Sequence, residues 1–339
     1  MKNIKFDFND ISLIPCTMSD ISSRNEINIL KNGKLPLMVA PMDTVVNKEN
    51  YQIFTNLGYI VCIPRTNPTN KKEYDDECFI SYGLDELEII IKNYGILPNR
   101  VLIDVANAHS IRVFNLAKKI KEIFDIELMV GNIANPETFR LYCEINVDFV
   151  RCGIGGGQVC TTSANTSIHY PMGSLIKECY DIKISNDSST KIVADGGFKN
   201  FDEIFKAYNL GADFVMLGGI INKSIESCGD NYQYINGEYK KINYAESLER
   251  FNYGELVFKE YRGMSTKEVQ KSWGKTNIKT SEGIKKYNKV EYTIKGWTEN
   301  FESYLKSCMS YQNKKSIEDF IGNSEYVFIT QNSFNRFNK

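Results

Sequence analysis

The stretch Phe149-Val-Arg-Cys-Gly-Ile-Gly-Gly-Gly-Gln-Val-Cys-Thr-Thr162 joins a short apolar run to a glycine-rich loop and then to a cysteine. The run from Val147 to Cys152 is rich in β-branched and aromatic residues, which is typical of a strand. Four of the next five residues are glycine, which lets backbone adopt positive φ and approach a ligand closely. A thiol in such a loop can act as a nucleophile. The stretch therefore predicts a strand that ends in a catalytic loop containing Cys160.

Short apolar runs of this kind recur along the chain and alternate with segments of helical length. The candidate strands are residues 37–40, 59–63, 78–82, 101–104, 127–131, 148–152, 191–194 and 213–217. Residues 110–124 have apolar side chains at spacings of three and four, which predicts an amphipathic helix. A second helix begins at Asn135-Pro-Glu-Thr, and a third spans residues 201–210 and ends at Gly211.

Several of the runs are apolar at consecutive positions, which favours strands buried on both faces of a parallel sheet. Eight such strands alternating with helices predict an α/β fold, a (β/α)₈ TIM barrel, with a doubly wound open sheet as the rival. Polar and glycine residues follow six of the strands: Asp43-Thr44, Asp104 with Asn107, Gly131-Asn132, the Cys160 loop, Asp195-Gly-Gly197 and Gly218-Gly219. Their convergence from strands spread along the whole chain favours closure into a barrel.

The pattern loosens after Gly219. Residues 226–262 are rich in Tyr and charge, and Asn236-Gly237 predicts a hairpin turn. Residues 263–296 are polar and lack apolar periodicity, which predicts a mobile flap. A helix over 297–323 and a strand over 326–330 would form a C-terminal extension. We therefore expect one catalytic domain over residues 1–339, without an inserted regulatory domain, in which 226–296 is an insertion plus an active-site flap.

The composition excludes several classes of protein. A formal net charge of -1 argues against a nucleic acid or a membrane surface as partner. The sequence has no apolar run of transmembrane length and no signal-peptide core at its start. Its nine cysteines are widely spaced, without a CxxC pair, which indicates reduced thiols in a cytoplasmic protein rather than disulfides or a metal cluster.

Taken together, these motifs resemble those of the IMP dehydrogenase and GMP reductase family. Residues 152–162 match its nucleophile loop, and Ala194-Asp-Gly-Gly197 and Met216-Leu-Gly-Gly219 match its two phosphate-binding turns. Further matches are Pro41-Met-Asp-Thr-Val45, Asp104-Val-Ala-Asn107, Gly131-Asn132, Tyr261-Arg-Gly-Met-Ser265 and Ser281-Glu-Gly283. The resemblance covers nearly the whole chain. It implies a (β/α)₈ barrel, a purine nucleotide substrate (GMP or IMP) and assembly as a homotetramer.

The family has two activities, and the flap separates them. The dehydrogenase branch activates water with an Arg-Tyr pair, whereas the segment between Gly263 and Ser281 contains neither Arg nor Tyr. The resemblance therefore favours NADPH-dependent reductive deamination of GMP to IMP and ammonia. His109-Ser110 and Arg262-Gly-Met lean toward the dehydrogenase branch. An IMP dehydrogenase without regulatory domains, converting IMP and NAD⁺ to XMP, stays an alternative, as does a purine-nucleotide-binding pseudoenzyme.

The resemblance also assigns roles in the reaction. Cys160 would attack purine C2, and Thr162 with Glu282 would deliver a proton to the leaving ammonia. As plainer roles, the hydroxyl of Thr162 would only stabilise the loop, and Glu282 would be a solvated surface charge. Asp195 would bind the ribose hydroxyls, or else cap a helix. The backbone N–H groups of Gly196, Gly197, Gly218 and Gly219 would bind phosphate, and Gly263, Met264 and Ser265 would lie along the purine.

The cofactor site has no Rossmann fingerprint, because Gly153-Ile-Gly155 does not open a helix in a G-x-G-x-x-G arrangement. The resemblance places NADPH across the barrel mouth, near Asp104, Asn107, Asn132, Gly153 and Gly155. It also implies a monovalent cation such as K⁺ on the backbone carbonyls of Gly153, Gly155 and Cys160. Two positions depart from the family. Gln158 stands where a phosphate-binding Ser is usual, and Ser163 stands where a basic residue is usual.

Overall fold

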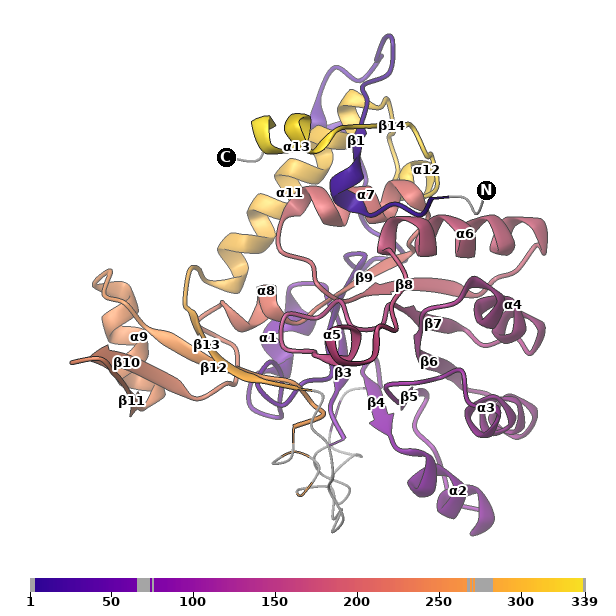
Figure 1. Ribbon diagram of the computed structural model, residues 1–339, viewed down its shortest axis with the longest axis horizontal. Coiled ribbons are helices and arrows are strands. Elements are labelled where there is room, and N and C mark those ends of the chain that lie inside the picture. Colours follow the sequence, from indigo (N-terminus) through magenta and orange to yellow (C-terminus); the bar gives the residue numbers. More distant parts are fainter. Residues whose placement is uncertain are drawn as a thin grey trace.

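The computed structural model describes residues 4–65, 74, 76–266, 269, 271 and 283–337. Its centre is a closed barrel of eight parallel strands in sequence order (Figure 1). These are β2 (Leu37–Val39), β3 (Ile60–Ile63), β4 (Phe79–Tyr82), β5 (Arg100–Asp104), β6 (Glu127–Ile133), β7 (Phe149–Cys152), β8 (Lys191–Asp195) and β9 (Phe214–Leu217). The pairing of β9 with β2, in which Met216 lies opposite Met38, closes the ring. The expected barrel is confirmed, and the open sheet is wrong.

The strands alternate between two apolar layers, which explains their continuous apolar runs. Side chains such as Met38, Phe79 and Phe149 fill the barrel interior, where the Phe79 and Phe149 rings lie 5.1 Å apart. Neighbours such as Leu37 and Val39 point outward and pack under the surrounding helices. Both faces of each strand are therefore buried. Side chains that could bind or react with a ligand are found at the ends of the strands.

Helices follow most of the strands. They are α1 (Tyr51–Asn56), α2 (Leu84–Lys92), α3 (Ile111–Ile123), α4 (Pro136–Glu144), α5 (Thr162–Thr166), α6 (Met172–Ser185), α7 (Phe201–Leu210) and α8 (Gly219–Asn222). Of these, α3, α4 and α7 have the ends that the sequence predicts for them. The Asn135 side chain accepts a hydrogen bond from the Glu137 N–H at the start of α4. Gly211 ends α7 with a φ of 119°. Among the described residues, no helix combines the length and apolar character needed to span a membrane.

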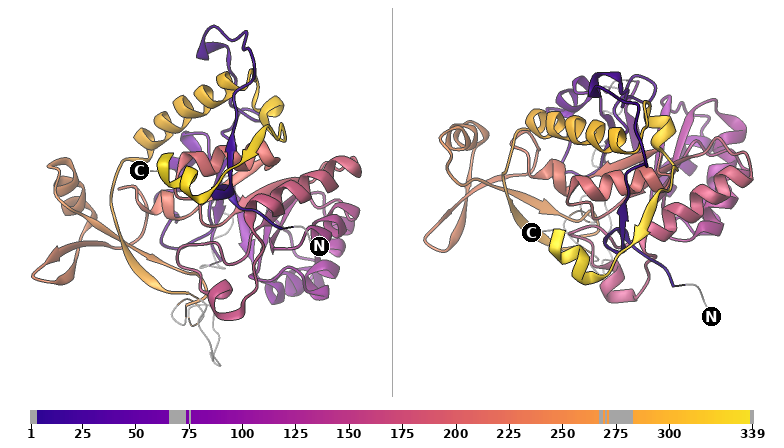
Figure 2. Two further views of the ribbon diagram at one scale, coloured as in Figure 1. Left: turned by 45° about the horizontal axis from the view of Figure 1, so that its top comes forward. Right: turned by 90° about the horizontal axis from the view of Figure 1, so that it is seen from above.

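The Tyr-rich insertion folds as a lobe beside the barrel (Figures 1 and 2). Four antiparallel strands lie in the order β11 (Glu238–Ile242), β10 (Asn231–Ile235), β12 (Phe258–Arg262) and β13 (Lys285–Lys289), with α9 (Tyr244–Asn252) alongside. Asn236-Gly237 forms the predicted turn between β10 and β11, and both residues have positive φ. Strand β13 falls in the segment that we expected to be only a flap. Residues 267, 268, 270 and 272–282 of that segment lie outside the described residues.

The first and the last strand of the chain pair with each other next to α7. Strand β1 (Ile11–Leu13) pairs antiparallel with β14 (Tyr326–Phe328). The remaining elements there are η1 (Phe8–Asp10), η2 (Arg24–Glu26), α11 (Ile294–Tyr311), α12 (Ile317–Phe320) and α13 (Gln331–Phe337). The expected helix over 297–323 is thus divided into α11 and α12, and α11 begins earlier because Thr293 caps it. The expected strand is shorter than predicted, and a last helix follows it.

Candidate active site

A buried arginine joins the ends of three barrel strands. Arg151 on β7 donates from Nη1 to Asp104 Oδ1 on β5 at 2.7 Å and from Nη2 to Asp195 Oδ2 on β8 at 2.8 Å. Burial by itself would lower the pKa of Arg151, but the two carboxylates outweigh it and raise the pKa, so the guanidinium stays charged. The two carboxylates predicted to bind cofactor and ribose are therefore held in one ion-pair network.

Asn132, at the end of β6, belongs to the same network. Its Nδ2 donates to Asp195 Oδ2 at 2.7 Å and to the Gly153 carbonyl at 2.8 Å. Both N–H bonds of the amide are committed to protein acceptors, so Oδ1 is the atom left to receive a hydrogen bond from a ligand. The structure thus brings Asp104, Asn132, Gly153 and Asp195 together at the barrel mouth, as the strand-end argument predicted.

The glycine loop needs its glycines because it packs directly on the turn after β8. Gly153 has a φ of 134°, and a Cβ built on it would lie 2.1 Å from the Asp195 carbonyl oxygen. Gly197 has a φ of 87°, and its Cβ would lie 2.4 Å from the Gly156 carbonyl oxygen. Larger residues would push the two turns apart. The loop before Cys160 and the predicted phosphate turn at Gly196 are therefore one packed unit.

Cys160 lies in this loop, partly exposed and next to the start of α5. Its thiol donates to Thr162 Oγ1 across 3.3 Å. The Cys160 N–H donates to the Gly157 carbonyl, and the backbone of Cys160 bridges to Gly283. The thiol and hydroxyl that were predicted to act together are in contact.

The two ends of the flap meet beside Cys160. Ile284 donates its N–H to Val159 O at 3.0 Å, and Gly263 donates its N–H to Ile284 O at 3.1 Å. A Cβ on Gly263 would lie 2.8 Å from Val159 O, so this close approach requires glycine. Met264 and Ser265 continue from there in a turn. Glu282 lies outside the described residues, immediately before Gly283.

The second turn predicted to bind phosphate is covered by residues that the sequence did not single out for this role. A Cβ on Gly219 would lie 3.3 Å from Gln158 Oε1, and that oxygen accepts a hydrogen bond from Lys286 Nζ at 2.6 Å. Burial first, and then Lys223 and Lys199, lower the pKa of Lys286. Gln158, which replaces the usual Ser, therefore brings an ammonium group beside Gly219.

Asn107 and His109 have structural contacts. Asn107 Oδ1 accepts a hydrogen bond from the His109 N–H at 3.1 Å. His109 Nε2 accepts from the Ala134 N–H at 3.0 Å, so its Nδ1 carries the proton and donates to Thr138 Oγ1 at 2.7 Å. Burial lowers the pKa of His109. The neutral ring thus joins two barrel loops, and the Asn107 side chain caps the turn that precedes His109.

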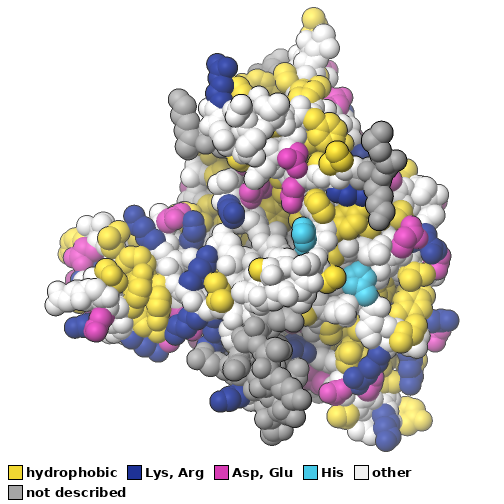
Figure 3. Space-filling model, in the orientation of Figure 1, with side chains coloured by type: hydrophobic (Ala, Val, Ile, Leu, Met, Phe, Trp, Pro, Cys, Tyr) yellow, Lys and Arg dark blue, Asp and Glu magenta, His cyan; other side chains and the backbone are white. Residues whose placement is uncertain are grey.

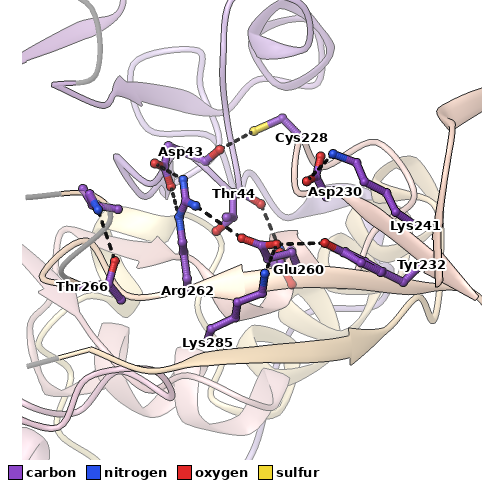
Figure 4. A network of polar contacts seen from close by, with 12 residues as sticks. Asp43, Thr44, Cys228, Asp230, Tyr232, Lys241, Glu260, Arg262, Thr266 and Lys285 are labelled. Atoms are coloured by element: carbon purple, nitrogen blue, oxygen red, sulfur yellow. Dashed lines mark hydrogen bonds and ion pairs between the residues drawn. The ribbon is translucent and has the colours of Figure 1, made fainter. Parts of the chain in front are cut away.

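Arg262 links the start of the flap to the loop after β2 (Figure 4). Its Nη2 donates to Asp43 Oδ2 at 2.7 Å, and Nη1 lies 3.4 Å from Glu260 Oε1. Glu260 also pairs with Lys285 at 2.7 Å. Arg151, Arg262 and Lys286 were all missed as site residues. Arg151 could have been identified as a site residue, because it is a basic residue inside an otherwise apolar strand. Lys286 could not, because it lies in a polar run in which a lysine is not unusual.

Two of the carbonyls predicted to hold a cation already accept hydrogen bonds. Gly153 O accepts from Asn132, and Gly155 O accepts from Ser163 Oγ at 3.1 Å. Each carbonyl keeps a second lone pair for a cation. Within the described residues, no group of three His, Cys, Asp or Glu side chains is arranged to hold a metal ion.

Comparison with known proteins agrees with this geometry. The model of the IMP dehydrogenase / GMP reductase domain matches residues 98–337. The chain belongs to this family. It is 30% identical to a GMP reductase of Staphylococcus epidermidis, over 97% of this chain and 98% of the relative. It is 27% identical to GMP reductase 2 of Bos taurus, over 97% of this chain and 95% of the relative. With a GMP reductase of Caenorhabditis elegans it is 26% identical, over 96% of this chain and 92% of the relative. Membership of the IMP dehydrogenase and GMP reductase family accounts for the closed barrel and for the loop that holds Cys160.

Proposed function

We propose that this protein is an oxidoreductase, a GMP reductase that converts GMP and NADPH to IMP, ammonia and NADP⁺. The observation that supports this most directly is the contact of the Cys160 thiol with Thr162 Oγ1, 3.3 Å apart, in a loop packed on the Asp195 turn. Relatives from bacteria and animals that are named GMP reductases match nearly the full length of the chain.

The chemistry proceeds through a covalent adduct on Cys160. The sulfur forms a bond to purine C2, the bond from C2 to the amino group breaks, and ammonia leaves with a proton relayed from Glu282 through Thr162. C2 then accepts a hydride, which NADPH supplies when bound. The bond between C2 and sulfur breaks last, which returns the thiol and releases IMP. Dividing the displacement in this way replaces one difficult step with two easier ones.

The substrate would lie across the packed turns. Asp195, fixed by Arg151 and Asn132, accepts hydrogen bonds from the ribose hydroxyls. Backbone N–H groups of Gly196, Gly197, Gly218 and Gly219 bind the phosphate, and Lys286 supplies a positive charge beside them. The segment Gly263-Met-Ser265 lies along the purine edge. In the family a Ser hydroxyl usually contacts the phosphate, and Gln158 has no hydroxyl. The positive charge of Lys286 would replace this contact.

The cofactor would bind next to the ion-pair network. The amide N–H groups of the nicotinamide carboxamide meet two acceptors there, Asn132 Oδ1 and the Asp104 carboxylate. Asn107, Gly153 and Gly155 shape the same side of the mouth. A monovalent cation on the carbonyls of Gly153, Gly155 and Cys160 would steady the loop. We further propose one catalytic domain over residues 1–339, with 226–296 as insertion and flap, that works in the cytoplasm as a homotetramer.

The test is a paired assay of the purified protein. GMP with NADPH should give loss of nicotinamide absorbance with release of IMP and ammonia. Cys160→Ala should abolish this turnover and leave GMP binding in place. Formation of NADH from IMP and NAD⁺ would instead make the protein a dehydrogenase. Turnover that survives in Cys160→Ala would overturn the covalent mechanism.

A further inference from the structure

The segment at residues 283–286, which follows the flap, runs along the loop that holds Cys160. Its backbone bridges to Cys160 and donates an N–H to Val159 O at 3.0 Å. A third contact is made by side chains, in which Lys286 Nζ donates to Gln158 Oε1 at 2.6 Å. The side chains of Lys286, Gln158 and Cys160 are all partly exposed. A lysine from a distant part of the chain thus holds the residue that stands two positions before the predicted nucleophile.

Lys286 lies next to both glycines of the second turn predicted to bind phosphate. Its Nζ is 5.6 Å from the centre of the Tyr261 ring, and a Cβ on Gly218 would lie 2.9 Å from the hydroxyl of that ring. Its other neighbour, the carboxamide of Gln158, would lie 3.3 Å from a Cβ on Gly219. Two separate sets of contacts therefore place the ammonium group of Lys286 beside this turn.

Positive charge surrounds Lys286. Lys199 follows the other turn predicted to bind phosphate, and Lys223 comes directly after α8, where it pairs with Glu291 at 2.9 Å. Burial is the main reason why the pKa of Lys286 is lowered, and these two lysines are the next. Lys and Arg side chains are visible where the lobe joins the barrel (Figure 3). Because Lys286 donates to an uncharged amide, a phosphate dianion is a stronger partner for its other N–H groups.

The three N–H donors of an ammonium group allow Lys286 to bind two acceptors at once. One N–H holds Gln158 Oε1, and another can donate to a phosphate at the turn. A hydrogen bond to the charged phosphate restricts the motion of Lys286, and thereby that of Gln158. Only Val159 separates Gln158 from Cys160, so this restriction also narrows the positions that the thiol can take. A nucleophile held in a reactive position lowers the barrier to attack.

We propose that Gln158 is a positioning residue that couples phosphate binding to the placement of Cys160 through its hydrogen bond with Lys286. This rests on the proposed function, in which the phosphate is that of the purine nucleotide. The two side chains then have different effects. Lys286 contributes to the affinity for the nucleotide, whereas Gln158 converts part of that binding into rate. Gln158 thus acts through a lysine, where the usual Ser of the family contacts the phosphate itself.

Kinetics with GMP and NADPH separate the two effects. Gln158→Met keeps the length of the side chain but removes the acceptor, and should lower kcat about tenfold while the Kd for GMP stays within about twofold. Gln158→Glu retains an oxygen for Lys286 and should recover kcat, with a higher KM because of its added negative charge. Gln331→Met, at an exposed glutamine of α13, is the matched control and should behave like the wild type.

Alkylation of Cys160 measures the coupling without turnover. Saturating inorganic phosphate should slow the reaction of Cys160 with iodoacetamide about threefold or more, because a loop that is held more firmly opens less often. Peptide mass spectrometry distinguishes Cys160 from the other eight of the nine cysteines. The effect of phosphate should be absent in both Gln158→Met and Lys286→Met, so the test stands if one of them folds poorly. It should persist in Lys289→Met, at an exposed lysine of the same strand.

The two measurements keep this coupling distinct from the proposed function. If the wild type does not turn over GMP, the proposed function fails, and alkylation still decides the coupling. The coupling is refuted if phosphate leaves alkylation of the wild type unchanged, or slows it equally in Gln158→Met. It is also refuted if Gln158→Met raises the KM for GMP without lowering kcat. Equal loss of kcat in Gln158→Glu and Gln158→Met would mean that Gln158 only supports the fold of the loop.

Discussion

The guanidinium of Arg262 makes two hydrogen bonds to the carboxylate of Asp43, Nη2 to Oδ2 at 2.7 Å and Nε to Oδ1 at 3.4 Å. The pair joins the end of β12, where the predicted purine-binding segment begins, to the loop after the first barrel strand. Both side chains are largely buried, with 25% and 13% of their surfaces exposed. The lobe and the barrel are thereby connected next to the active site.

Breaking this pair should affect substrate binding more than folding. We expect Asp43→Asn and Arg262→Gln each to raise the KM for GMP severalfold, because Gly263-Met-Ser265 loses its anchor. The kcat/KM of the double variant should be no lower than that of either single variant. A double-mutant cycle on kcat/KM should therefore give a coupling free energy of about 1 kcal/mol between Asp43 and Arg262. The same cycle on Glu246 and Arg250, a pair within α9 that does not touch the predicted purine-binding segment, should give no coupling in kcat/KM. Additive effects at Asp43 and Arg262 would contradict this role.

Removal of the Thr162 hydroxyl tests the proton relay. Thr162→Val should lower kcat with GMP and NADPH about a hundredfold and change KM little, because protonation of the leaving ammonia is lost. Thr161→Val is the matched control, since the Thr161 side chain makes no capping hydrogen bond to α5. Equal loss of activity in both variants would mean that the loop was disturbed rather than the chemistry.

Lys286 should distinguish nucleotide from nucleoside. Lys286→Met should raise the KM for GMP about tenfold and leave the binding of guanosine unchanged, because only the phosphate contact is lost. Because the pKa of Lys286 is lowered, this side chain should lose its charge at a lower pH than an ordinary lysine. The difference in KM for GMP between the wild type and Lys286→Met should disappear over the same pH range. Lys289→Met, exposed on the same strand, is the control. A parallel loss of guanosine binding would place Lys286 outside the phosphate site.

Gly153 and Gly157 should respond differently to the same substitution. Gly153→Ala should reduce the free energy of unfolding by about 2 kcal/mol or more, because it combines a positive φ with a clash against the Asp195 carbonyl. In Gly157→Ala the new Cβ would meet only the Cys160 side chain at 3.6 Å, an ordinary contact. Chemical denaturation of both variants measures the difference. Similar stabilities would mean that the two turns do not pack as described.

The buried Lys259 predicts a pH dependence of stability. Its pKa falls from 10.5 in the unfolded chain to about 8 in the native state. Between these values the unfolded chain binds more protons, so this group makes stability rise with pH, and its burial penalty is complete below pH 8. The free energy of unfolding of wild type minus that of Lys259→Met should therefore increase by about 3 kcal/mol from below pH 8 to above pH 10.5. A flat difference across this range would contradict the prediction.

The sequence predicted the barrel strands to within two residues at each end because each strand is apolar on both faces and bounded by turns. Helix ends were readable where a local signal existed, as at Asn135 and Gly211. Strand β13 was missed because Lys285-Lys-Tyr-Asn-Lys289 has no strand pattern of its own, and its pairing with β12 decides its structure.

In the candidate site, too, local sequence patterns predicted some residues, whereas others depend on contacts between distant parts of the chain. Cys160, Thr162, Asp195 and Asn132 could be named from motifs, and the structure brings them to one end of the barrel. The contacts of Asp195 could not be predicted, because Arg151 and Asn132 approach it from other strands and meet it only when the barrel closes. Lys286 reaches Gln158 across 128 residues of sequence, which no local pattern encodes.

The pairing of β1 with β14 places the first and the last strand of the chain side by side, with Ile11 opposite Phe328. Shortening the chain from its C-terminus would also release the first strand, so the two extremities are gained or lost as one unit.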